Sequence, residues 1–78
     1  MKSERHLTAR QCECLQRIAR GQTTAEIAAA LNLSRHTVDH YIGAACDRLR
    51  AKSRAHAVAT AIALEIIKPP KPTIVGEF

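Results

Sequence analysis

Aromatic residues are nearly absent from this chain: Tyr41 and Phe78 are the only two, and there is no tryptophan. Sheets usually draw on aromatic and β-branched residues, so this scarcity disfavours a β-rich fold. Alanine instead occurs 14 times in 78 residues, which suits helices that approach one another closely. A chain this short buries only about 60% of its unfolded surface, so we expect one small domain that dimerisation would help to stabilise.

The sequence also lacks a long apolar run. Its longest apolar stretch, residues 55–67, is interrupted by His56, Thr60 and Glu65, and is too short and too mixed to cross a bilayer. Residues 1–6 are polar and no apolar stretch follows them, so we expect no secretory leader and no membrane partner.

Cysteines are few and odd in number: Cys12, Cys14 and Cys46. This count argues against a disulfide scaffold and favours the reducing cytoplasm. Cys12 and Cys14 are two positions apart on an expected helix, so they point in different directions and do not readily share a metal. We expect Cys46 to pack as a small apolar group, and redox sensing by the thiols stays open as an alternative.

Motifs for enzyme chemistry are missing as well. There is no glycine-rich phosphate loop and no spacing typical of a nucleophile and its base, so we predict neither an enzyme nor a cofactor. His36 and His40 are four residues apart on one helical face, a spacing that suits zinc. Two ligands do not make a site, however, and Asp39 points elsewhere, so we predict no metal.

What the chain does have is positive charge. Twelve lysines and arginines against seven acidic residues give a net charge of +5 and a pI near 9.6, which favours an anionic partner such as nucleic acid. Residues 34–54 contain two acids, Asp39 and Asp47. They contain five cations: Arg35, Arg48, Arg50, Lys52 and Arg54.

Capping residues and apolar spacing predict four helices. The first follows Thr8 and ends before Gly21, the second runs from Thr23 to about Asn32, the third covers about 34–49, and the fourth runs from Ser53 to about 67. The prolines of 68–72 would stop the last helix. We therefore expect a polar segment at 1–6, one all-α domain at 7–67 and an extended, proline-rich tail at 68–78.

The second and third helices, joined by the tight turn at 32–34, predict a helix-turn-helix unit. Apolar residues of the third helix would face the core, namely Val38, Ile42, Ala45 and Leu49. Polar and small residues would then lie on its outer, N-terminal half, namely Arg35, His36, Asp39, His40 and Gly43. A recognition helix presents that half to base edges in the major groove of duplex DNA.

These residues sit within a longer pattern that resembles the LuxR/GerE-type helix-turn-helix domain over about residues 7–67, without a gap. The pattern consists of Leu7, Thr8, Arg10, Glu13, Leu15, Ala19, Gly21, Thr23, Thr24, Glu26, Ile27, Ala28, Leu31, Leu33, Ser34, Thr37, Val38, Arg48, Leu49, Arg54, Ala57 and Val58. The resemblance implies a four-helix, sequence-specific transcriptional regulator, here free-standing, which binds duplex DNA and often dimerises through its fourth helix.

Specific contacts follow for this chain. We expect phosphate contacts from Thr24, Ser34, Arg35, Thr37 and Arg48. We expect base-edge contacts from Asp39, His40 and Gly43, with His36 on the same face. A homodimer seam is expected along the fourth helix at Val58, Ile62 and Ile66, which would place two recognition helices at half-sites about 10 base pairs apart.

The chain departs from the family pattern in four places. Gln11 replaces a usual glutamate, Asp39 a lysine on the reading face, and Tyr41 a frequent histidine. The family's Lys-Leu-Gly-Val turn reads Arg48-Leu49-Arg50-Ala51. A carboxylate at position 39 implies either a different target or weaker DNA binding. The alternatives are an antiactivator that pairs with a full-length LuxR-type regulator, a sigma-factor-like module that also contacts RNA polymerase, and a small helical bundle that binds protein.

Overall fold

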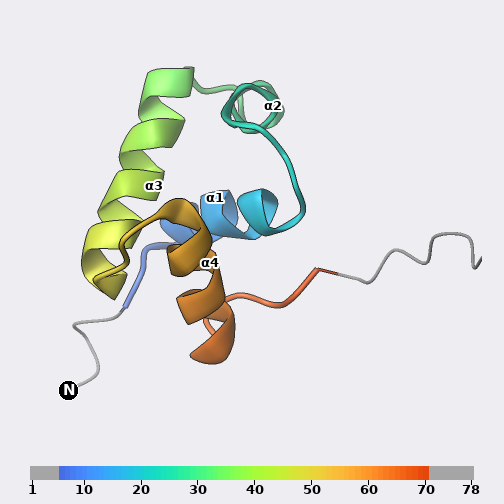
Figure 1. Cartoon of the computed structure of the whole chain (residues 1–78). Coiled ribbons are helices and arrows are strands. Elements are labelled where there is room, and N and C mark those ends of the chain that lie inside the picture. Colours follow the sequence, from blue (N-terminus) through green and yellow to red (C-terminus); the bar gives the residue numbers. More distant parts are fainter. Residues whose placement is uncertain (1–5, 71–78) are drawn as a thin grey trace, which may run out of the picture.

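The computed structural model describes residues 6–70, and this part of the chain contains four helices and no strand. They are α1 (Ala9–Ala19), α2 (Thr24–Leu31), α3 (Arg35–Leu49) and α4 (Arg54–Ala63). Figure 1 shows α2 beside the start of α3 and α4 near its end, with α1 crossing between them. The all-α prediction is confirmed, whereas predictions about residues 1–5 and 71–78 fall outside the described residues.

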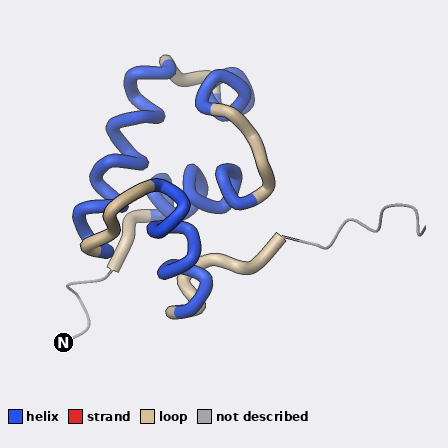
Figure 2. Tube along the Cα trace, viewed as in Figure 1, coloured by secondary structure: helices blue, strands red, loops and turns tan. Residues whose placement is uncertain are grey.

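Each helix begins directly after the capping residue that the sequence predicts. Figure 2 shows these helices and the loops that join them. The side chains of Thr8 and Thr23 each accept a hydrogen bond from the backbone N–H three residues on. In return, the side chains of Gln11 and Glu26 accept a hydrogen bond from the backbone N–H of the capping threonine. Ser34 and Ser53 cap α3 and α4 with a single side-chain bond each. These caps are local, which is why the sequence alone locates them.

The end of α4 differs from the prediction. The helix stops at Ala63 rather than near 67, well before the prolines. Glu65 adopts a left-handed conformation (φ 61°). The last turn is closed by two backbone hydrogen bonds: the Glu65 N–H donates to the Ile62 carbonyl at 2.9 Å, and the Ile66 N–H donates to the Ala61 carbonyl at 2.8 Å. This is the same closing pattern that Gly21 gives α1, but glutamate carries no sequence signal for it.

We expect Glu65→Gly to stabilise the fold by about 1 kcal/mol, because a left-handed conformation costs a residue with a Cβ about that much. The substitution also removes a negative charge from the C-terminal end of α4, where the helix dipole disfavours it. Thermal unfolding measures the gain. Asn32→Gly is the control, since Asn32 has the same conformation (φ 58°) but tolerates it better; an equal gain in both variants would contradict this explanation.

The core consists of two clusters of buried side chains. The first joins α1, α3, α4 and both flanking segments through Leu7, Leu15, Ala45, Leu49, Ala57, Ala61 and Ile67. The second joins α1, α2 and α3 through Cys14, Ile27, Ala28, Val38 and Ile42. The inward positions predicted for α3 are all buried, which leaves the opposite face of that helix to solvent.

The segment after α4 folds back onto α1. Ile67 is buried, and the side-chain amide of Gln16 pairs with the backbone of Lys68 in both directions. Gln16 Nε2 donates to the Lys68 carbonyl at 2.7 Å, and the Lys68 N–H donates to Gln16 Oε1 at 3.0 Å. The expected tail at 68–78 therefore begins with a residue that is fastened to the domain.

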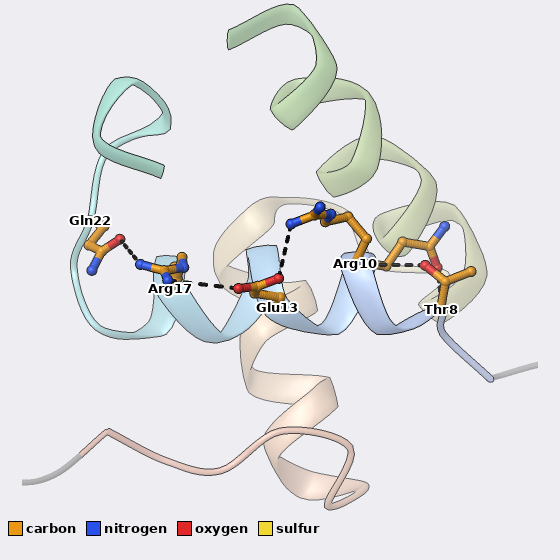
Figure 3. A network of polar contacts seen from close by, with 6 residues as sticks. Thr8, Arg10, Glu13, Arg17 and Gln22 are labelled. Carbon is orange, nitrogen blue, oxygen red and sulfur yellow. Dashed lines mark hydrogen bonds and ion pairs between the residues drawn. The ribbon is translucent and has the colours of Figure 1, made fainter. Parts of the chain in front are cut away.

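The outer face of α1 is a chain of local polar contacts (Figure 3). Glu13 lies between Arg10, at 3.2 Å, and Arg17, at 3.7 Å, and Arg17 also donates to Gln22 at 3.3 Å. Ion pairs this exposed contribute about 0–1 kcal/mol each. Arg10 and Arg17 thus form a partly solvent-exposed face whose contacts are mainly with neighbours along the chain.

Candidate nucleic-acid interface

The turn between α2 and α3 fixes the angle at which α3 is presented. Asn32 takes the left-handed conformation that ends α2, and Leu33 then packs against the second core cluster. Ser34 caps α3 immediately afterwards. Because Ile27 of α2 and Val38 of α3 are fully buried, the two helices are held as one unit.

The outer face of α3 is exposed along its first three turns. Arg35, His36, Asp39, His40 and Gly43 are all exposed, so they share the surface that the sequence predicts. A shallow hollow on this face is lined by His36, Asp39, His40, Gly43, Ala44 and Asp47. The face is therefore open to a partner that runs across the helix.

Gly43 has no packing role within the described chain. A Cβ built at this position meets no atom within 4 Å. Glycine inside a helix costs about 1 kcal/mol relative to alanine, and nothing in the fold offsets this cost. A close approach by a partner at this point of α3 would explain the residue.

The two hydroxyls at the start of α3 bond to each other. Ser34 Oγ accepts from the Thr37 backbone N–H at 3.0 Å and donates to Thr37 Oγ1 at 2.9 Å. The Thr37 hydroxyl keeps its own proton, which it can donate to an oxygen of a partner. Thr37 is better placed than Ser34 to act as a donor.

Asp39 takes part in a network that the sequence does not predict. Arg54 Nη2 donates to Asp39 Oδ1 at 2.6 Å, and Arg54 Nη1 donates to Thr24 Oγ1 at 3.0 Å. The Thr24 hydroxyl also reaches Asp39 Oδ1, at 3.4 Å. The hydrogen bond from Arg54 is the main cause that lowers the pKa of the Asp39 carboxyl, so Asp39 stays ionised.

Arg54 contacts two residues of the predicted site, Asp39 and Thr24, but is itself missing from that prediction. The sequence showed it only as one cation among five and as part of the family pattern. Its contact with Asp39 spans 15 residues and depends on where α4 begins, which local pattern does not reveal.

Arg48 lies apart from the other predicted contacts. It is thirteen residues beyond Arg35 on α3, or about 20 Å along the helix axis. Its Nη1 donates to the backbone carbonyl of His6 at 2.9 Å. Arg48 therefore holds the segment before α1 against α3, and its phosphate contact stays a prediction.

The predicted seam residues of α4 are less free than the sequence implies. Val58 and Ile62 are half-buried against the first core cluster, and Ile66 lies beyond the end of α4 in its closing turn. Exposed small and apolar residues lie beside them, namely Ala55, Ala59, Ala63 and Leu64. Alanine thus predominates on the outer face of α4, which also carries the exposed His56.

The three cysteines are buried or half-buried. Burial raises the pKa of the Cys12, Cys14 and Cys46 thiols, which lowers their thiolate fraction and so disfavours thiol redox chemistry. Among residues 6–70, no three His, Cys, Asp or Glu side chains gather closely enough to bind a metal ion. In the same range, no helix combines the length and the apolar character that crossing a bilayer requires.

The arrangement of α2, its turn and α3 defines a helix-turn-helix domain. Residues 5–61 match the sequence pattern of the family described as bacterial regulatory proteins, luxR family. This chain belongs to that family.

The relatives are bacterial transcriptional regulators. The quorum sensing-dependent transcriptional regulator VjbR of Brucella abortus is 43% identical over 65 residues, which cover 83% of this chain and 25% of that protein. The transcriptional activator protein VanR of Vibrio anguillarum is 40% identical over 63 residues, covering 81% of this chain and 26% of that protein. This chain spans about a quarter of the length of these two relatives.

Proposed function

We propose that this protein binds duplex DNA sequence-specifically and regulates transcription, with α3 lying in the major groove. The observation that carries the proposal is the exposed outer face of α3, held at a fixed angle by the α2–α3 turn and bordered by Arg54 of α4. An α-helix fits the width of that groove, and the start of α3 presents side chains that can meet base edges.

The roles divide by position. Phosphate contacts are assigned to Ser34, Arg35 and Thr37 at the start of α3, and to Thr24 and Arg48, whose side chains also form bonds within the fold. Base contacts are assigned to Asp39, His40 and Gly43, with His36 beside them. Gly43 would allow a base or sugar to come close to the helix backbone, which accounts for a glycine that the fold itself does not need.

The functional unit proposed is a homodimer joined through the outer face of α4, around Val58, Ile62 and Ile66 together with Ala59. A two-fold dimer places its recognition helices on successive major-groove faces, about 10 base pairs apart. The small side chains of α4 allow its helix to approach a second copy closely.

Selection of bound duplexes from a random-sequence pool tests this function. The expected result is enrichment of an inverted repeat with half-sites about 10 base pairs apart. An antiactivator that pairs with a full-length LuxR-type regulator would enrich no sequence, and a sigma-factor-like module would bind core RNA polymerase. Either of those results would replace the proposal.

Arg35→Gln should weaken binding to every duplex and reduce the slope of log K against log salt concentration by about 0.9, the value for one phosphate contact. Arg35 is exposed in the first turn of α3 and bordered by the Ser34 and Thr37 hydroxyls. Fluorescence anisotropy at several salt concentrations measures the slope. Arg20→Gln, at the exposed residue directly after α1, removes the same charge outside the reading face and should leave the slope unchanged; equal slopes in all three proteins would refute the assignment.

A further inference from the structure

Three helices meet at the carboxylate of Asp39. Asp39 belongs to the second turn of α3, Thr24 is the first residue of α2, and Arg54 is the first residue of α4. Arg54 bridges the other two with separate nitrogens, at 2.6 Å to Asp39 Oδ1 and 3.0 Å to Thr24 Oγ1. The carboxylate is therefore held by partners from both neighbouring helices.

Stability does not account for this arrangement. The side chains of Arg54 and Asp39 are 44% and 52% exposed, and ion pairs so open to water add little to folding. Nor does the pair fill a gap in the core. Its distinct property is that it fixes the direction of a charged group on the reading face of α3.

Only one oxygen of the carboxylate is used. Both contacts end on Oδ1, and among residues 6–70 no hydrogen bond or ion pair reaches Oδ2. Because Asp39 is ionised, Oδ2 can only accept a hydrogen bond. The partner at Oδ2 must therefore be a donor.

The charge of Arg54 removes the main objection to an acid in a DNA groove. An unpaired carboxylate is repelled by phosphates, whereas the Asp39–Arg54 pair carries no net charge. In the major groove cytosine presents an amino donor, while guanine and thymine present acceptors that repel a carboxylate. Adenine has an amino group too, but its N7 acceptor lies beside it.

We propose that Arg54 is a positioning residue for base recognition, which holds Asp39 so that its free oxygen Oδ2 accepts a hydrogen bond from the amino group of a cytosine. This inference rests on the proposed DNA-binding function. It adds the base that Asp39 recognises, a cytosine, and the residue that orients Asp39, which is Arg54. Thr24 completes the support from α2, so the same network ties the start of α4 to the reading face.

The test compares sequence selection by the wild-type protein, Asp39→Asn, Arg54→Gln and the double variant. Wild type should favour cytosine at one position of each half-site by about tenfold, and both single variants should lose most of that preference at the same position. The double variant should lose no more than Asp39→Asn alone, because Arg54 acts through Asp39. Arg20→Gln, which removes a charge at the residue directly after α1, should keep the full preference.

Salt dependence and thermal unfolding separate this role from two simpler ones. If Arg54→Gln keeps the cytosine preference and lowers the salt slope by about 0.9, Arg54 is a phosphate contact and the inference is wrong. If Arg54→Gln weakens all duplexes equally and unfolds at a lower temperature, its role is structural and the inference is again wrong. If wild type selects a sequence but Asp39→Asn selects the same one, only this inference fails; if wild type selects nothing, the proposed function fails with it.

Discussion

Replacing Ala59 by glutamate is expected to convert the protein to monomers and to weaken its binding to a duplex with two half-sites about hundredfold, because the second recognition helix no longer binds at high effective concentration. Ala59 lies at the centre of the exposed apolar face of α4, between Ala55 and Ala63. A carboxylate buried in an apolar helix seam without a partner is strongly unfavourable. Sedimentation equilibrium and DNA titration measure the two effects.

The advantage of Ala59 over Ile62 is that Ala59 faces solvent, whereas Ile62 also packs against the first core cluster. A charge at Ile62 would disturb the fold as well as the seam, so a loss of dimer there would have two explanations. Ala30→Glu places the same charge on an exposed position of α2 and should leave the dimer intact. If Ala59→Glu remains dimeric, the seam lies on another surface.

The parts of the fold that the sequence predicts are those set by neighbours in the chain. The capping box of Thr8 and Gln11 closes within one turn, and the buried stripe of α3 repeats every three to four residues. The end of α4 could not be predicted in this way. Glu65 is left-handed because the segment after it is pulled back onto α1, where Ile67 is buried.

The same distinction holds for the candidate site. Periodicity alone places Arg35, His40 and Gly43 on one exposed face, and the structure has them there. Periodicity says nothing of partners from other helices, so the sequence left open whether Asp39 implies a different target or weaker DNA binding. Its pairing with Arg54 depends on how α3 and α4 pack, and this pairing is the observation that favours the first alternative in the inference above.

Truncation of Ile27, the buried side chain that holds α2 against the core, should have the largest effect on the free energy of unfolding. Ile27→Ala is expected to lower the free energy of unfolding by about 3 kcal/mol, out of about 5 kcal/mol for a domain of this size. Ile27 is fully buried between α1 and α3 and is the largest buried side chain that α2 contributes to the core. Urea unfolding followed by circular dichroism measures the change.

Because α2 also sets the angle of α3, the same substitution links stability to function. Ile27→Val removes one methyl group and should cost only about 1 kcal/mol, so it serves as the matched control. DNA that binds only the folded state should recover part of the stability of Ile27→Ala, in proportion to the logarithm of its concentration. A cost below about 1 kcal/mol for Ile27→Ala would mean that α2 is held mainly by its turn and by Thr24, and the α2–α3 unit would then be less rigid than its buried contacts indicate.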